Sequence, residues 1–252
     1  MTEEKSCDEV VVGRNAVAEL LKSGAADKIF IQRESRYDKP MMLIISLAKK
    51  QSVPLAECDK KKLDMLSGST PHQGVAAYRA QTEYCSIEDI LARAREAGEK
   101  ALVVICDGVS DVHNIGAIIR SAECSGAHGV IIPKRNSAGI TTAAVKASAG
   151  ATEHMLISRV ANISAAIETL KKNNVWCYAV ELGGEEFYKT DFSSSTAFVL
   201  GSEGDGVSPL VKKNCDGVIS IPMYGHINSL NVSAAAAVVL TEAARQRHSS
   251  GV

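Results

Sequence analysis

Short apolar runs in the second half of the chain constrain the fold most strongly. They contain few polar residues, and helix-like stretches separate them. The runs are ALVVIC (101–106), HGVIIP (128–133), HMLISR (154–159), WCYAVEL (176–182), TAFVLG (196–201) and GVISIP (217–222), and the helical candidates are 114–125, 140–148, 162–173, 207–214 and 232–247. Near-continuous apolar strands that alternate with helices are typical of a parallel sheet covered on both faces. The pattern predicts an α/β domain over 101–252.

A smaller α/β domain is predicted for residues 1–80. Short apolar runs alternate there with helix-like stretches, as in KIFIQ (28–32) and PMMLIISLAKK (40–50). Such a module is about the smallest that folds alone. The following segment, 81–100, is rich in charge and has a Ser86-to-Asp89 capping pattern ahead of one short amphipathic helix. We interpret 81–100 as a linker.

Charge and cysteine content narrow the class of protein. The chain has 252 residues and a formal net charge of −1, so any RNA-binding surface has to be a local basic patch. The tight basic cluster Lys60-Lys61-Lys62 is either a solvated helix face or a contact to phosphates. The seven cysteines are scattered without a CxxC pair, and the histidines lack metal-site spacing, so we assign no metal.

The location that we expect is the cytoplasm. The first residues, MTEEKSCDEV, lack the layout of a secretory signal, and no apolar run approaches the ~18 residues that span a bilayer. Scattered cysteines of odd number fit a reducing compartment.

Turn-forming residues gather at three junctions between a predicted strand and a predicted helix. The segments are DGVSDVHNIGAIIRSAECSGA (107–127), AFVLGSEGDGVS (197–208) and VISIPMYGHINSLNVSAAAAVV (218–239). Ligands of open α/β sheets bind at the carboxyl ends of the strands, so three such junctions suggest one composite site. This convergence favours an enzyme.

The first junction places Asn114 at a helix start, with Gly116 and Arg120 following. Asn114 could be only an N-cap and Arg120 a solvated helix residue. Alternatively, Arg120 reaches a reacting centre, where its guanidinium could hold a phosphate by paired hydrogen bonds.

The second and third junctions suggest a nucleoside pocket. Gly201-Ser202-Glu203-Gly204-Asp205-Gly206 lets the backbone approach a ligand, but it matches neither GxxxxGK[ST] nor GxGxxG, and it could be a plain turn. In the third junction, Ser229 or Asn231 is a natural N-cap. Backbone groups beside Ile221 and Leu230 could hold an adenine by its edge, although an ordinary strand-loop-helix connection has the same pattern.

Together, NIGAIIR, LGSEGDGVS and IPMYGHINSLNVSAAAAVV resemble the three ordered motifs of the SpoU (TrmH-like) RNA 2′-O-methyltransferases of the SPOUT superfamily, over 101–252. GRNAV (13–17) and HQGVAA (72–77) resemble the small L30e-like RNA-binding domain of the bacterial subfamily that methylates a large-subunit rRNA guanosine. The resemblance implies a catalytic domain with a deep trefoil knot and bound S-adenosylmethionine. It also implies a homodimer whose active site lies at the subunit interface.

Site residues follow from the resemblance position by position. It implies a catalytic set of Arg120, Asn114, Glu203, Ser229 and Asn231, and a cofactor-binding set of Leu200, Gly201, Gly204, Ile221, Pro222, Met223, Ser229 and Leu230. Because the ordinary pKa of arginine lies above ~12, we expect Arg120 to position the ribose hydroxyl and stabilise negative charge rather than act as a free base. Tyr224 and His226 are bulkier than the family pattern leads us to expect.

The resulting functional prediction is a methyltransferase that acts on a ribose 2′-hydroxyl of RNA, a guanosine of large-subunit rRNA. One alternative is a tRNA ribose methyltransferase, and another is a non-catalytic RNA-binding factor of ribosome assembly. The separate N-terminal domain favours rRNA by analogy, and the intact set Arg120, Glu203 and Asn231 argues against a mere binder.

Overall fold

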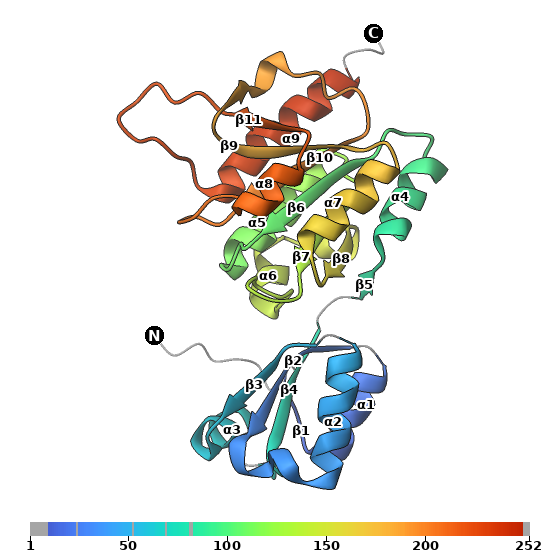
Figure 1. Ribbon diagram of the computed structural model, residues 1–252, viewed down its shortest axis with the longest axis vertical. Helices are drawn as coiled ribbons and strands as arrows, with labels where there is room; N and C mark the ends of the chain where they lie inside the picture. Colours follow the sequence, from blue (N-terminus) through green and yellow to red (C-terminus); the bar gives the residue numbers. More distant parts are fainter. Residues whose placement is uncertain (1–9, 24, 52, 69, 81–82, 249–252) are drawn as a thin grey trace. The chain divides into compact units, whose positions relative to one another are not determined.

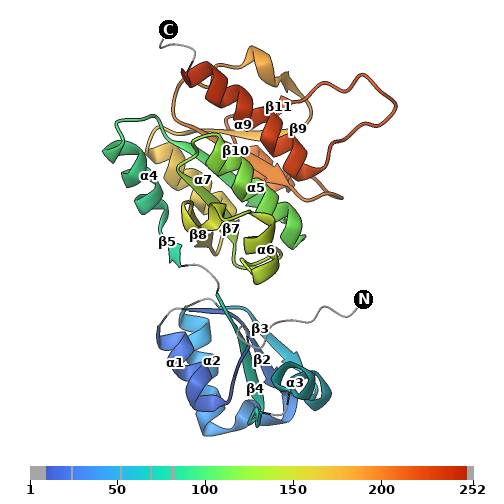
Figure 2. The same cartoon turned by 180° about the vertical axis from the view of Figure 1, so that it is seen from behind.

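The computed structural model describes residues 10–23, 25–51, 53–68, 70–80 and 83–248. The chain divides into two compact units, Met1–Glu83 and Tyr84–Val252, and Figures 1 and 2 show both from opposite sides. Each unit has its own sheet and its own buried apolar clusters.

The first unit is a four-stranded sheet between helices. The strand order is β1-β4-β2-β3, in which β4 is antiparallel to β1 and β2, while β3 is parallel to β2. Helices α1 and α2 bury one apolar cluster on the sheet, and α3 contributes Leu63 to another beside Phe30 and Ala76. The elements are β1 (Val10–Val12), α1 (Arg14–Lys22), β2 (Ala26–Gln32), the 3-10 helix η2 (Arg33–Tyr37), α2 (Lys39–Lys50), β3 (Leu55–Cys58), α3 (Lys60–Ser67) and β4 (Val75–Arg79).

The second unit contains the parallel sheet that the sequence predicts. Seven strands lie in the order β11-β9-β10-β6-β7-β8-β5, and every pairing between neighbours is parallel. The strands are β5 (Tyr84–Cys85), β6 (Leu102–Asp107), β7 (Gly129–Pro133), β8 (Leu156–Val160), β9 (Trp176–Glu186), β10 (Thr196–Gly201) and β11 (Gly217–Ser220). All six residues of β10 are buried, as its apolar sequence leads us to expect.

Helices cover both faces of this sheet (Figures 1 and 2). One buried cluster contains side chains of α5 and α9, and the other contains side chains of α4, α7 and α8. The helices are α4 (Ile87–Glu96), α5 (Val112–Cys124), α6 (Thr142–Ala147), α7 (Ile163–Lys172), α8 (Pro209–Asn214) and α9 (Val232–His248), with short 3-10 helices η3 (Ala151–Glu153) and η4 (Phe187–Lys189).

The prediction of a linker over 81–100 is wrong for most of that segment. Tyr84 and Cys85 pair with β8, and α4 buries Ile87, Ile90 and Leu91 against the second unit. The predicted capping box at Ser86 is confirmed, with Asp89 as its second member. The alternation of charged and apolar residues in α4 marks an amphipathic helix, and its apolar side needs a core to cover it. Residues 81 and 82 lie outside the described residues.

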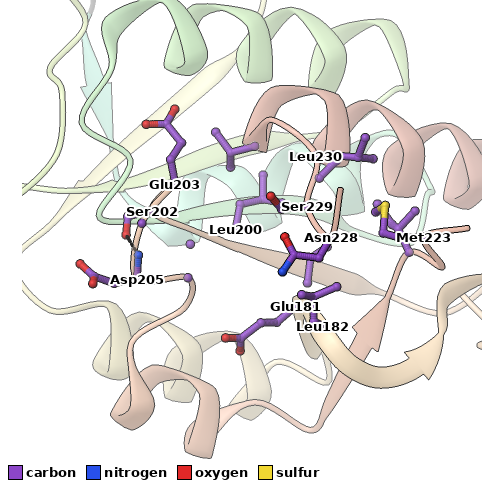
Figure 3. Close-up of a pocket in the computed structure, with 17 residues that line it drawn as sticks. Glu181, Leu182, Leu200, Ser202, Glu203, Asp205, Met223, Asn228, Ser229 and Leu230 are labelled. Atoms are coloured by element: carbon purple, nitrogen blue, oxygen red, sulfur yellow. Dashed lines mark hydrogen bonds between the residues drawn. The ribbon is translucent and has the colours of Figure 1, made fainter. Parts of the chain in front are cut away.

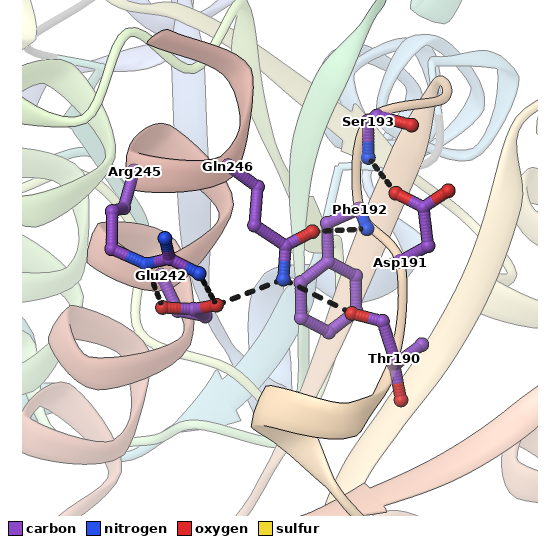
Figure 4. Close-up of polar contacts among 7 residues, drawn as sticks. All are labelled: Thr190, Asp191, Phe192, Ser193, Glu242, Arg245 and Gln246. Atoms are coloured by element: carbon purple, nitrogen blue, oxygen red, sulfur yellow. Dashed lines mark hydrogen bonds and ion pairs between the residues drawn. The ribbon is translucent and has the colours of Figure 1, made fainter. Parts of the chain in front are cut away.

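Hydrogen bonds connect the end of α9 to the segment before β10 (Figure 4). The Gln246 side chain donates to the Thr190 carbonyl over 3.0 Å and accepts from the Phe192 N–H over 2.7 Å. Glu242 accepts hydrogen bonds from Arg245 and Gln246, and the bond from Arg245 contributes most to holding the pKa of this carboxyl below its ordinary value. These contacts hold the end of α9 against the segment that precedes β10.

Among the described residues, none of the helices combines the length and apolar composition needed to cross a membrane. The same residues contain no group of three or more His, Cys, Asp or Glu side chains placed to hold a metal ion.

Candidate active site

The three junction segments meet at the carboxyl edge of the parallel sheet. Strand β6 leads into α5, β10 leads into the glycine-containing loop, and β11 leads into the loop before α9. Strand β6 connects to its neighbour β7, whereas β10, on the other side of β6, connects past β9 to β11. The two connections therefore run in opposite directions along the sheet. A reversal of this kind opens a crevice where ligands of α/β proteins bind. The three junctions that the sequence singles out therefore lie at one edge of the sheet.

The loop after β10 folds back on itself at Gly201. Ser202 and Gly206 exchange both backbone hydrogen bonds over 3.0 Å. A Cβ atom at Gly201 would lie 2.0 Å from the Gly206 carbonyl carbon, so no other residue fits there. Gly206 has a φ of +68°, which favours glycine for a second reason. Asp107 at the end of β6 accepts the Ser208 N–H over 2.8 Å and so ties the loop to the neighbouring strand.

A chain of amide and carboxylate groups links the three segments. The Asn114 amide donates to Glu203, and the Asn231 amide donates to the Asn114 carbonyl oxygen over 3.0 Å. Asn114 is partly buried, whereas Glu203 and Asn231 are exposed. These two hydrogen bonds therefore join residues that are 89 and 117 positions apart along the sequence.

Helix capping explains how these side chains are oriented. Asn114 is not the N-cap of α5, because Asp111 accepts the N–H groups of His113 and Asn114 over 2.6 and 3.1 Å. The Asn114 side chain is consequently free to bond across to the other segments. Of the two caps predicted for α9, Ser229 and Asn231, it is Asn231 whose side-chain oxygen accepts from the Ser233 N–H over 2.9 Å.

A pocket of about 390 Å³ opens beside this chain of polar groups (Figure 3). Many of the predicted catalytic and cofactor-binding residues line this pocket, namely Leu200, Gly201, Glu203, Gly204, Ile221, Met223, Ser229 and Leu230. Its volume lies in the ~300–1,000 Å³ range of small-molecule and cofactor sites. Pro222, Asn114 and Asn231 are not among the described residues that line it.

Arg120 is placed differently from the other predicted residues. It lies on α5, six positions after Asn114, or nearly two turns at about 3.6 residues per turn. Its side chain is exposed, and it is not among the described residues that line the pocket of its own chain. Gly116 between them is constrained by packing, because a Cβ there would lie 2.5 Å from the Ala144 carbonyl oxygen of α6.

Strand β9 supplies a wall of the pocket that the sequence analysis missed. Val180, Glu181 and Leu182 line the pocket, and Glu181 pairs with Lys212 of α8 at 2.7 Å. The signal that could have revealed this wall is the carboxylate itself, since WCYAVEL is otherwise an apolar run. Ser202, Asp205, Gly206, Asn228, Val232 and Ala235 complete the lining.

Two thiols of the second unit are held uncharged. Burial raises the pKa of Cys106, at the end of β6, to about 12, and it raises the pKa of Cys215, after α8, to about 11. Because the thiolate is the reactive form, neither thiol is a competent nucleophile at neutral pH.

In the first unit, the two segments that resemble an RNA-binding domain lie side by side. The Arg14 backbone N–H donates to the Gln73 side chain over 3.1 Å, and its guanidinium pairs with Asp38 at 2.6 Å. Lys60, Lys61 and Lys62 are exposed on α3. Residues 10–80 contain 12 Lys and Arg against 7 Asp and Glu, so this stretch is basic, although the whole segment 1–83 has 13 against 12.

Comparison with known proteins identifies the family. The model described as "SpoU rRNA Methylase family" matches residues 101–241, which is more than half of the chain. The chain belongs to the SpoU rRNA methylase family. A second model, "RNA 2'-O ribose methyltransferase substrate binding", matches residues 10–85.

Similar proteins cover almost the whole chain. A protein of Staphylococcus saprophyticus, whose name assigns it to the TrmH family of tRNA/rRNA methyltransferases, is 43% identical over 96% of this chain and 97% of its own length. YacO of Bacillus subtilis, named in the same way, is 39% identical over 96% and 98%. The SpoU methyltransferase AviRb of Streptomyces viridochromogenes, solved in complex with the cofactor AdoMet, is similar in structure with a TM-score of 0.61, 25% identity, and coverage of 95% of this chain and 90% of its own.

Proposed function

We propose that this protein transfers a methyl group from S-adenosylmethionine to a ribose 2′-hydroxyl of RNA. The observation that carries the proposal is the linked set Asn114, Glu203 and Asn231 at the rim of a cofactor-sized pocket. The family match and the AdoMet complex of AviRb support it.

The pocket fits the chemical groups of S-adenosylmethionine. Leu200, Ile221, Met223 and Leu230 offer apolar contact for an adenine. The loop Gly201–Gly206 offers backbone groups that few side chains obstruct, and nothing lies within 4 Å of a Cβ built at Gly204. The carboxylates of Glu203 and Asp205 suit a cationic molecule. Bound there, the cofactor would supply an electrophilic methyl group on a positively charged sulfur.

The acceptor hydroxyl has to be activated before it can take up the methyl group. A neutral hydroxyl is a poor nucleophile, so charge that develops on its oxygen has to be stabilised as its proton leaves. Asn114, Glu203, Ser229 and Asn231 would orient the ribose. Because Arg120 is exposed and absent from its own chain's pocket lining, we propose a homodimer in which a second copy supplies this guanidinium.

The substrate is proposed to be a guanosine of large-subunit rRNA in the cytoplasm. Support for an RNA substrate comes from the excess of Lys and Arg over residues 10–80 and from the match of residues 10–85 to a substrate-binding model. A tRNA substrate is the second candidate, because the names of the relatives include both RNA classes. The trefoil knot of the SPOUT superfamily is part of the proposal for the second unit.

The test is methyl transfer from tritiated S-adenosylmethionine to unmodified large-subunit rRNA, with unmodified tRNA in parallel. We expect label in rRNA that is recovered as 2′-O-methylguanosine after nuclease digestion. Label in tRNA alone would support the second candidate. Tight RNA binding without label in either RNA would identify a non-catalytic factor and overturn the proposal.

A further inference from the structure

Strand β9 bulges away from β11 where it passes the pocket. Val218 of β11 pairs with Ala179, but the next residue, Ile219, pairs with Glu185, so Val180–Gly184 has no partner in the β11 ladder, although Val180 still pairs with Leu200 of β10. The return is tight, because a Cβ at Gly184 would lie 2.3 Å from the Val218 carbonyl oxygen. Bulges beside active sites redirect side chains, and this one directs Glu181 and Leu182 to the pocket.

The two oxygens of Glu181 have different surroundings. Oε2 lies 2.7 Å from the Lys212 Nζ, and the Glu181 side chain is 24% exposed. Oε1 lies beneath the glycine-containing loop, where a Cβ on Gly206 would be 2.9 Å away. A half-buried ion pair adds little to stability compared with apolar residues of similar size. A carboxylate retained in an otherwise apolar strand wall therefore points to a ligand.

We propose that Glu181 accepts hydrogen bonds from the ribose hydroxyls of the cofactor's nucleoside, and this inference rests on the function proposed above. A carboxylate at a strand end is the group that recognises a ribose hydroxyl in other open α/β sheets. Lys212 offsets the charge of Glu181, so this carboxylate suits neutral hydroxyl donors better than the sulfonium. Figure 3 shows Glu203 and Glu181 on different sides of the pocket, so the nucleoside and the reacting methyl would lie apart.

The experiment measures binding rather than activity. Calorimetry with the full chain gives the dissociation constants of S-adenosylhomocysteine and of its 2′-deoxy and 3′-deoxy analogues. A hydrogen bond to a charged acceptor corresponds to roughly 10- to 100-fold in affinity, so wild type should prefer the ribo ligand by that factor over at least one analogue. In Glu181→Ala the ribo ligand and the discriminated deoxy analogue should bind with about equal affinity, because the variant loses affinity for the ribo ligand and keeps the wild-type affinity for the analogue.

Lys212→Met is the matched control, because it removes the ion pair and leaves the carboxylate in place. It should retain the preference for the ribo ligand, and circular dichroism confirms that both variants are folded. If Glu181→Ala and Lys212→Met weaken all three ligands equally, or if Glu181→Ala keeps the wild-type preference, the inference is overturned. If wild-type protein binds none of the ligands, the proposed function itself fails.

Discussion

At the scale of single residues, Arg120 tests whether the site is shared between copies. Replacing Arg120 by Ala removes the guanidinium that would stabilise the ribose oxygen, and loss of one such donor costs about 10²- to 10³-fold in kcat. Cofactor affinity should stay at the wild-type value, because Arg120 does not line the described pocket. Arg120→Lys should remain impaired, since an ammonium lacks the paired donors. Methyl incorporation and calorimetry measure the two effects, and full activity in Arg120→Ala contradicts the assignment.

Two substitutions separate the capping role of Asn231 from the catalytic role that we propose for it. Asn231→Asp keeps an N-cap oxygen for α9 but loses the amide donor to Asn114, so stability should be retained while methyl transfer falls. Asn231→Ala loses the cap as well and should lower the free energy of unfolding by about 0.5–2 kcal/mol. Urea denaturation and methyl incorporation are the measurements. Wild-type activity in Asn231→Asp would show that the link to Asn114 is dispensable.

At the scale of elements, α4 decides where the catalytic domain begins. A fragment 84–252 keeps Ile87, Ile90 and Leu91 in the core, whereas a fragment 101–252 uncovers the surface that they fill. Each buried apolar side chain of this size contributes about 1.5–3 kcal/mol, so the shorter fragment should lose on the order of 5 kcal/mol. That loss approaches the whole stability of many domains.

Thermal unfolding followed by circular dichroism compares the two fragments. The longer fragment should unfold cooperatively at the temperature of the second unit in the full chain, and the shorter one should be largely unfolded at 25 °C. Equal melting temperatures would show that α4 is a linker after all.

At the scale of the whole molecule, a buried histidine makes stability depend on pH. The His128 Nδ1 accepts the Leu102 N–H over 3.1 Å, and its Nε2 lies 3.2 Å from Glu99. Burial lowers the pKa of His128 below 6.5, although Glu99 acts in the opposite direction, and Arg247 and Arg93 add to the lowering.

Below pH 6.5 the unfolded chain therefore binds a proton at His128 that the folded chain resists. The contribution of His128 is complete above about pH 6.5, and stability should fall as the pH drops from 6.5 toward the folded-state pKa. Urea denaturation between pH 7.5 and 5 measures this slope. His128→Asn, which retains an acceptor for the Leu102 N–H, should flatten it, and an unchanged slope would exclude His128 as the cause.

The family and the order of the elements could be predicted from the sequence, because both are written locally. Apolar runs mark β6 to β11, and the glycine pattern around Gly201 marks a turn that only glycine can form. The same local signals allowed Asn114 to be an N-cap and suggested a linker over 81–100. The N-cap of α5 is Asp111, since neighbouring polar residues compete for that position. The sequence of an amphipathic helix such as α4 does not show which core its apolar side packs against.

Tertiary structure alone decided which residues meet. The order of the strands in the sheet brings α5, the loop after β10 and the start of α9 together. The spacing of apolar residues along the chain predicts the strands but not their order in the sheet. The bulge in β9 that adds Glu181 to the pocket arises from its register with β11, a property of two strands and not of one. The sequence by itself thus determined the elements and their chemistry, whereas long-range pairing decided the pocket, because register and strand order depend on contacts between distant segments.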